Sequence, residues 1–340
     1  MNRAKLLVLF SALCVLAACS CPSGSCESAA AAPAAKGDER HVSFSAVTTV
    51  PNITAGTKEL RLWIPAPLQE DSQQIVDHDI KVDAGGAASK SALVVSGPNR
   101  WWTVVVTNPP ASVSVTQSLT AKRKEVLRAP SSAAVRALNQ DERVAFAAEL
   151  GPHKLVPLGG PKLDPLIAEV APGSHDAVQI ARAAYRTLLE RMRYSKDGEG
   201  WGRGDSNWAC DSRYGNCTDF HSLFMSIVRA KGVPARFTMG FPIPEAHGTG
   251  VVGGYHCWAE FFAPGIGWIP VDISEADKHP ELADYYFGNL TEDRIAFVLG
   301  RDLVLQPAPS SGPQNIFIYA LAEADGAPLK TERRMSYTDL

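Results

Sequence analysis

Residues 40 to about 130 alternate between apolar and polar side chains with a period of two. The apolar residues at 42, 44 and 46, at 60, 62 and 64, and at 102, 104 and 106 each fall on one face of an extended segment. Turn-forming residues separate these segments, at Pro51-Asn52, Gly85-Gly86 and Asn108-Pro109-Pro110. Because short strands divided by such turns are typical of a sandwich, we expect an antiparallel β-sandwich over residues 40–130.

The pattern changes after residue 130. Residues 131–173 hold no long period, so we expect an irregular connection with a short helix near 141–149. A helical period follows between His175 and Arg193, with Ser174 as its cap, and another runs from Cys217 to a stop at Gly232. Extended segments at 254–262, 267–272 and 316–321 then predict one α+β body over residues 174–322. The polar residues 323–340 are expected to form a tail.

The first residues predict export rather than a buried helix. Arg3 and Lys5 precede an apolar run that ends at Ala18, which is too short to span a bilayer. We therefore predict a signal peptide over 1–18. The run Leu16-Ala17-Ala18-Cys19 resembles a bacterial lipoprotein signal, which implies a lipid on Cys19. Residues 19–39 are small and polar and read as a tether. Ser20 resembles the pattern that directs such proteins to the outer membrane, facing the periplasm.

Charge excludes one class of partner. The chain carries 33 Lys and Arg against 36 Asp and Glu. Removal of residues 1–18 takes Arg3 and Lys5 away, which leaves 31 against 36 and a formal net charge of −5. No basic run or basic-aromatic stripe interrupts this balance, so we expect no nucleic acid partner. The oligomeric state has no signal in the sequence.

Three residues stand in settings that suit thiol chemistry. Cys217 opens a predicted helix, where the macrodipole and unpaired N–H groups favour a thiolate and can hold an oxyanion. His256 lies in one predicted strand and Asp272 ends the next. A thiol nucleophile needs a base, and the base needs an orienting carboxylate. We therefore predict Cys217, His256 and Asp272 as a catalytic triad.

Four motifs in this region carry a family resemblance: Gly215-Asn216-Cys217, then Lys231-Gly-Val-Pro-Ala-Arg236, then Tyr255-His-Cys-Trp-Ala-Glu260, then Gly267-Trp-Ile-Pro-Val-Asp272. In this order they resemble the transglutaminase-like superfamily. The resemblance implies a papain-like α+β core and assigns the triad to the same three residues. The superfamily includes crosslinking enzymes, peptidases and inactive members, so the resemblance leaves these alternatives open.

The expected function is that of a cysteine peptidase or amidohydrolase acting on a peptide or protein through a thioester on Cys217. Water would resolve the thioester as hydrolysis, and a lysine amine would resolve it as transamidation. The alternatives are a protein transglutaminase and a non-catalytic peptide-binding lipoprotein of the envelope. The mechanism requires no cofactor, and no acidic loop of the EF-hand kind points to calcium.

A metal site is the chemical rival to the triad. Cys217 and His221 at helical spacing, with the adjacent His256 and Cys257, supply enough ligands. Against it, neighbours on a strand point to opposite faces, so His256 and Cys257 are not expected to share an ion. Asp219 and His221 are expected to be solvated groups or supports of the triad.

The remaining cysteines carry weaker hypotheses. In an exported protein, Cys210 and Cys257 are candidates for a disulfide that leaves Cys217 free, and Cys21 and Cys26 are candidates for another. The Gly-rich stretch between Tyr194 and Cys210, with Trp208 near its end, is a candidate wall of the substrate cleft. Packing of the same stretch as an ordinary surface loop is the alternative.

Overall fold

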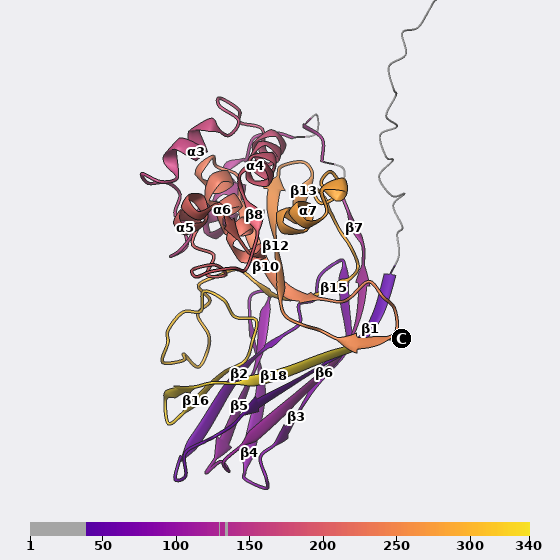
Figure 1. The fold of residues 1–340 in the computed structure, drawn as a ribbon, viewed down its shortest axis with the longest axis vertical. Helices are drawn as coiled ribbons and strands as arrows, with labels where there is room; N and C mark the ends of the chain where they lie inside the picture. Colours follow the sequence, from indigo (N-terminus) through magenta and orange to yellow (C-terminus); the bar gives the residue numbers. More distant parts are fainter. Residues whose placement is uncertain (1–38, 129, 133–134) are drawn as a thin grey trace, which may run out of the picture. The chain divides into compact units, whose positions relative to one another are not determined.

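The structure is a computed structural model that describes residues 39–128, 130–132 and 135–340. The predicted signal peptide, the lipidation site at Cys19 and the Cys21–Cys26 pair lie outside the described residues. All described residues belong to one compact unit. They form a mixed α+β fold in which two antiparallel sheets accompany a third sheet that is flanked by helices (Figure 1).

The first two sheets form the predicted β-sandwich. One has the order β11-β18-β1-β6-β3 and the other the order β17-β16-β2-β5-β4. Aliphatic side chains from both sheets meet in one apolar core that includes Val50, Leu62 and Val104. The strands of the first sheet are β1 (Glu39–Val50), β3 (Gln73–Asp83), β6 (Val113–Lys124), β11 (Thr249–Val251) and β18 (Glu332–Asp339). Those of the second are β2 (Glu59–Ala66), β4 (Ser89–Ser96), β5 (Asn99–Thr107), β16 (Leu321–Ala324) and β17 (Ala327–Leu329).

The third sheet is antiparallel and has the order β13-β12-β10-β15. Its strands are β10 (Ala235–Pro242), β12 (His256–Ala263), β13 (Gly267–Val271) and β15 (Arg294–Leu299). Two short pairs complete the strands: β7 (Val126–Leu127) with β14 (Asn289–Leu290), and β8 (Arg193–Tyr194) with β9 (Tyr214–Gly215).

Helix α6 (Cys217–Ala230) packs on β12 and β10, and α4 (Ala177–Arg191) lies beside it (Figure 1). The other helices are α1 (Gln140–Ala145), α2 (Ala147–Leu150), α3 (Asp164–Glu169), α5 (Ser206–Ser212), α7 (Ile273–Lys278) and the 3-10 helix η2 (Pro280–Leu282). The short helix predicted near 141–149 is present as α1 and α2. None of the helices in the described part of the chain is long and apolar enough to cross a membrane.

The helix predicted from His175 to Arg193 begins later and has a different cap. The Asp176 carboxylate accepts hydrogen bonds from the Val178 and Gln179 N–H groups, at 2.8 and 3.0 Å. Ser174 instead bonds to the Asp176 N–H and the Gln179 side chain. The Asp176 side chain satisfies two of the first free N–H groups of α4, so the helix starts at Ala177.

The expected polar tail is wrong. Residues 332–339 form β18, which pairs with β1 along eight residues and with β11 on its other side. Met335 and Tyr337 are buried at a spacing of two, a strand signal that the surrounding charged residues obscure. The expected strand at 316–321 is also displaced: β16 begins at Leu321 and pairs with β2 of the sandwich, not with the third sheet.

Candidate active site

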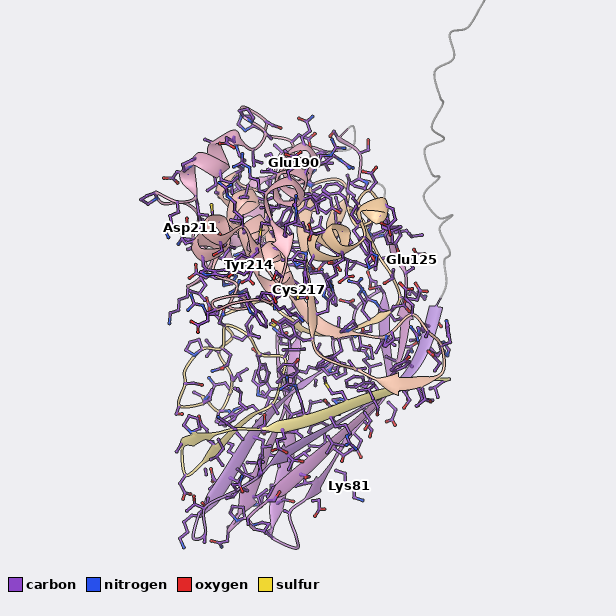
Figure 2. The ribbon with its side chains drawn as sticks, viewed as in Figure 1. Lys81, Glu125, Glu190, Asp211, Tyr214 and Cys217 are labelled. Carbon is purple, nitrogen blue, oxygen red and sulfur yellow. The ribbon has the colours of Figure 1, made fainter. Side chains whose placement is uncertain are left out.

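Cys217 is the first residue of α6, and its side chain is buried (Figure 2). The helix begins there because Asn216 caps it. The Asn216 side chain accepts a hydrogen bond from the Thr218 N–H at 2.9 Å, and the Asp219 carboxylate accepts one from the Asn216 N–H at 3.0 Å. After Lys231, Gly232 ends the helix in a left-handed conformation with φ +79°. The cap therefore fixes the thiol at the positive end of the helix dipole.

Asp219, expected to be solvated or supporting, is fully buried. Its carboxylate oxygens also accept hydrogen bonds from the Gly202 and Gly204 N–H groups, at 2.6 and 3.0 Å. A Cβ at Gly215 would lie 2.5 Å from Asp219 Oδ2, so glycine is needed there for the carboxylate to fit. Asp219 thus ties the Gly-rich stretch to the start of α6. Burial raises the pKa of Asp219, and these backbone donors oppose that rise.

His256 and Asp272 lie at facing ends of neighbouring strands. His256 is the first residue of β12, and Asp272 follows β13 directly and caps α7. The His256 Nε2 atom lies 2.7 Å from Asp272 Oδ2, and both side chains are buried. The other ring nitrogen, Nδ1, is then left for Cys217, whose thiol hydrogen-bonds to His256. The structure brings all three predicted residues together.

The charges of the three residues reinforce one another. Burial lowers the pKa of His256. The charge of Asp272 and the hydrogen bond to it outweigh burial and raise that pKa to about 10. Burial raises the pKa of Cys217, but hydrogen bonds from Cys257 and His256 and the charge of His256 bring it well below its usual value. The pKa of Asp272 is also lowered: burial raises it, and the charge of His256 more than compensates. These shifts favour a thiolate on Cys217 and an imidazolium on His256.

His221 lies on α6 one turn after Cys217 and is fully buried. Its Nδ1 atom is 2.7 Å from the Cys217 carbonyl oxygen, and its Nε2 accepts the Ile273 N–H at 3.0 Å. A carbonyl can only accept and an N–H can only donate, so the ring is neutral with its proton on Nδ1. Burial likewise lowers the pKa of His221. His221 thus joins the nucleophile residue to the residue that follows Asp272.

Tyr255 makes a second link between strand and helix. Its hydroxyl lies 2.7 Å from Thr218 Oγ1 and 3.1 Å from Asn216 Nδ2, at the start of α6. Its backbone N–H donates to the Tyr319 hydroxyl at 2.9 Å. Because Tyr255 immediately precedes His256, these bonds fix the end of β12 against the start of α6, where Cys217 lies.

Arg294, at the start of β15, is a member of the site that no sequence pattern indicated. Its Nη1 atom lies 2.9 Å from Asp272 Oδ2, the same oxygen that His256 approaches. The side chain is buried, and its guanidinium lies 5.0 Å from the ring centre of Trp258. Arg294 is 22 residues beyond Asp272 along the chain, so only the pairing of β15 with β10 brings it to the site.

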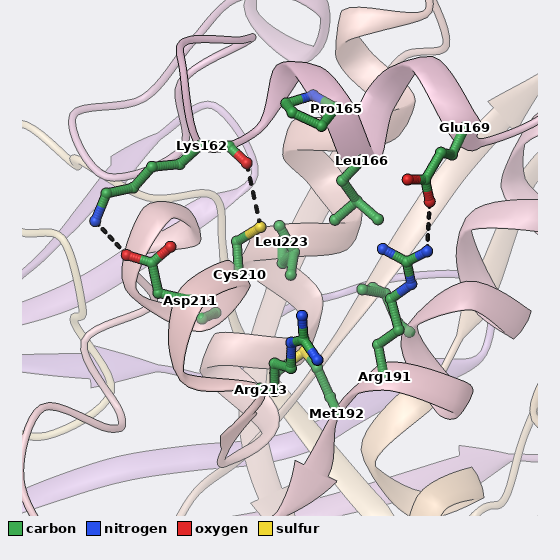
Figure 3. A pocket seen from close by; sticks show the side chains of 12 residues that line it. Lys162, Pro165, Leu166, Glu169, Arg191, Met192, Cys210, Asp211, Arg213 and Leu223 are labelled. Atoms are coloured by element: carbon green, nitrogen blue, oxygen red, sulfur yellow. Dashed lines mark hydrogen bonds and ion pairs between the residues drawn. The ribbon is translucent and has the colours of Figure 1, made fainter.

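The three described cysteines are free thiols, and the expected Cys210–Cys257 disulfide is therefore wrong. Cys257 is buried among Thr218 and Cys217. Cys210 lies in a pocket of about 320 Å³ beside α3 and α5, where its Sγ approaches the Lys162 carbonyl oxygen at 3.4 Å (Figure 3). The two thiols face different surroundings, and none of the triad residues lines the pocket around Cys210.

The hydrogen bonding of the site fits a triad better than a metal centre. One ligand atom from each of His256, Asp272 and Glu275 lies within 4.8 Å of the others. Asp272 Oδ2, however, already accepts from His256 and from the cationic Arg294, which would repel a metal ion. Cys257 is not part of that group of possible ligands, although it and His256 both interact with the Cys217 thiol.

Trp208 and the Gly-rich stretch pack on the body of the protein. The Trp208 ring makes an edge contact with Tyr214 at 5.2 Å, and a Cβ at Gly200 would lie 2.5 Å from Trp208 Nε1. Arg301 holds the stretch from the other side, because its Nη2 donates to the Gly204 carbonyl at 2.9 Å. The stretch is thus fixed over the start of α6 from two directions.

Comparison with known proteins shows which family this part of the chain is similar to. Residues 165–273 match the family model described as the transglutaminase-like superfamily. A crystal structure of a candidate cysteine protease from Cytophaga hutchinsonii has the same fold, with a TM-score of 0.58 and 14% identity over 89% of this chain and 91% of that one. The periplasmic domain of TgpA from Pseudomonas aeruginosa gives a TM-score of 0.37 and 17% identity, covering 73% and 91%.

A relative found by sequence comparison matches a smaller part of this chain than the solved structures do. An uncharacterized protein of Haemophilus influenzae is 35% identical over a match that covers 34% of this chain and 40% of that protein. This chain therefore spans less than half the length of that relative. The family match contains Cys217, His256 and Asp272 and ends at Ile273, within the first turn after the last of them. The similarity to the transglutaminase-like superfamily thus covers the segment from residue 165 to residue 273.

Proposed function

We propose that this protein is a thiol-dependent amide hydrolase of the cysteine peptidase type that acts on a peptide or protein. One observation carries the proposal: the Cys217 thiol, the His256 ring and the Asp272 carboxylate are hydrogen-bonded in a row, with 2.7 Å between His256 Nε2 and Asp272 Oδ2. A thiolate next to an imidazolium is the form in which a cysteine attacks a carbonyl.

The reaction follows from the two protonation states. The Cys217 thiolate attacks the amide carbonyl carbon, and the C–N bond breaks as His256 gives its Nδ1 proton to the leaving amine. A thioester on Cys217 remains. The now neutral His256 takes a proton from water as the water attacks the thioester, which releases the carboxylic acid and restores the thiol pair. Asp272 holds the ring in place and stabilises its charged form.

The start of α6 restricts how the oxyanion is stabilised. The Thr218 N–H is bonded to the Asn216 side chain, and the Asp219 N–H to the Asn216 carbonyl at 3.1 Å. Of the first three N–H groups of α6, the Cys217 N–H is therefore the one left to donate to the oxyanion. We assign that group as the backbone donor to the oxyanion.

The test is an acyl-enzyme experiment with the full chain. A peptide library is incubated with the wild type and with Cys217→Ala, and products are identified by mass spectrometry. The proposal expects cleaved peptides and a thioester adduct on Cys217 with the wild type alone. Addition of a fluorescent primary amine distinguishes the alternative, because a transglutaminase would attach that amine to a glutamine side chain in preference to releasing acid. A wild type that yields no product and no adduct would refute catalysis and leave a binding protein.

We also propose that the chain is a lipid-anchored protein of the bacterial envelope and that Cys19 carries the lipid. The support is the sequence pattern alone. Labelling with a fatty acid in a bacterial host, followed by membrane fractionation, compares the wild type with Cys19→Ala. We expect label and membrane association only for the wild type. A label that persists in Cys19→Ala would contradict this anchor.

A further inference from the structure

Arg294 lies at the end of a row of buried groups that begins at the nucleophile. Cys217 bonds to His256, His256 to Asp272 Oδ2 at 2.7 Å, and Asp272 Oδ2 to Arg294 Nη1 at 2.9 Å. We propose that Arg294 is a positioning residue that maintains the Cys217 thiolate by supplying the positive charge that balances Asp272. This inference rests on the proposed thiol chemistry and assigns a further residue to the same site.

The charges of Cys217, His256, Asp272 and Arg294 balance only when all four groups are present. With Arg294 present, the thiolate, imidazolium, carboxylate and guanidinium sum to zero. Without it, the same thiolate state would carry one uncompensated negative charge. All four residues are at most 6% exposed, so water does little to screen that charge. A buried set with a net negative charge retains protons more strongly, and both Cys217 and His256 would lose theirs at higher pH.

The neighbouring ionisable groups do not replace this charge. Tyr194 and Tyr255 face Cys217, and burial raises the pKa of both, so they are neutral. Cys257 and His221 also face it; burial raises the pKa of the first and lowers that of the second, so they are neutral as well. Tyr185 and Tyr286 face Asp272, and burial raises their pKa values too.

The charged groups around the row are acids or are already paired. Glu275 lies 3.8 Å from His256 Nε2 and is bonded to Lys278 at 2.6 Å. Asp219 is held by backbone N–H groups. Arg123 is close enough to feel the charge of Arg294 and is paired with Glu70. Among the described residues, Arg294 is therefore the cation that contacts the triad carboxylate besides His256.

The contacts of Arg294 depend on its charge. Its Nη1 atom bonds to Asp272 Oδ2, its Nη2 atom approaches Thr291 Oγ1 at 3.4 Å, and the Trp258 ring covers one face of the guanidinium. Removal of one partner of a buried ion pair leaves the other charge uncompensated. An apolar side chain cannot supply the positive charge next to Asp272.

The experiment measures the ionisation of Cys217 in the substrate-free full chain. The ultraviolet absorbance of the thiolate and the rate of alkylation by iodoacetamide are followed from about pH 4 to about pH 11, with Cys217→Ser as the blank. Arg294→Gln removes the charge and keeps a hydrogen-bond donor, and Arg294→Met also removes the donor. Arg294→Lys keeps a charge. Arg229→Met is the matched control, since Arg229 is a buried arginine near the other end of α6, where it donates to the Gly151 and Ala235 carbonyls.

We expect Arg294→Gln and Arg294→Met to move the midpoint of thiolate formation upward by about one pH unit, and the alkaline midpoint in the same direction. Arg294→Lys should restore most of the shift, and Arg229→Met should leave both midpoints unchanged. A folded charge-free variant with the wild-type midpoints would overturn the inference, as would an equal shift in Arg229→Met. If Arg294→Lys is the only variant that folds, a shift of its thiolate midpoint by about one pH unit would also overturn the inference. A wild type that forms no thiolate below about pH 8.5 would instead contradict the proposed function.

Discussion

Helices α4 and α6 pack against each other, but they bury different parts of their surfaces. In α4 the buried residues form an apolar stripe that includes Val178, Ala181 and Leu188, and the polar residues between them stay accessible. In α6 every residue from Cys217 to Arg229 is buried. The buried polar side chains of α6 therefore require hydrogen-bond partners inside the protein, and near the start of the helix those partners are other parts of the site.

This contrast separates packing from chemistry. The polar residues of α4 are exposed or partly exposed to solvent. Those of α6 are fixed from outside the helix: Asp219 by the Gly-rich stretch, His221 by Ile273, and Ser222 by Arg301. A helix with buried polar residues on all sides thus marks a site, whereas an amphipathic helix supports one.

The largest expected effect comes from the first residue of α6. Cys217→Ala should lower the hydrolysis rate by about ten-thousand-fold, because no thioester can form. Its thermal unfolding midpoint should stay within a few degrees of the wild type, since the change removes one sulfur atom. Steady-state rates and calorimetry on the same samples measure both. A variant with more than a tenth of wild-type activity would remove Cys217 from the mechanism.

Asp219→Ala should have the next largest effect, because it leaves three backbone N–H groups without their acceptor. We expect a loss of about 3 kcal/mol in the free energy of unfolding. The rate should also fall by about a hundred-fold, because the Asn216 N–H loses its acceptor and the start of α6 loses its attachment to the Gly-rich stretch. Denaturant titration and kinetics give the two values. Unchanged stability would mean that the buried carboxylate does not hold the stretch.

The pH dependence of kcat/KM tests the protonation state of His256. The value of kcat/KM should be flat through neutrality and fall about tenfold per pH unit above about 10, where His256 loses the proton that it gives to the leaving amine. The same raised pKa contributes stability that is fully present below about pH 6.5 and is lost as the pH rises through about 10. A profile that falls near pH 7 would contradict the imidazolium assignment.

The smallest effect is expected on the accessible face of α4. Arg186 is exposed, so Arg186→Ala should change the free energy of unfolding by less than about 0.5 kcal/mol and leave the rate unaltered. Parallel denaturant titrations and rate measurements test this. A loss of activity in Arg186→Ala would show that α4 does more than pack.

Cys217, His256 and Asp272 could be predicted from the sequence because each lies in its own local pattern, and the motifs follow in a fixed order. Their catalytic roles stay a prediction. The α+β core and the sandwich were predictable for a similar reason, since the helical and alternating periods are clear. Arg294 was not predictable, because its position depends on the pairing of β15 with β10. The burial of Asp219 depends on contacts with Gly202 and Gly204, which its own helix does not encode.

Strand β18 has a consequence for when the site becomes complete. It pairs with β1, the first described strand, and with β11, which leads through Val252 to Tyr255 and His256. The first sheet therefore cannot close until residues 332–339 have been synthesised, and contacts of such long sequence separation form slowly. A nascent chain that already contains Cys217, His256 and Asp272 thus lacks the last support of the histidine strand. The support of the histidine strand is therefore complete only after residues 332–339 have joined the first sheet, which is later than the appearance of the chemical groups themselves.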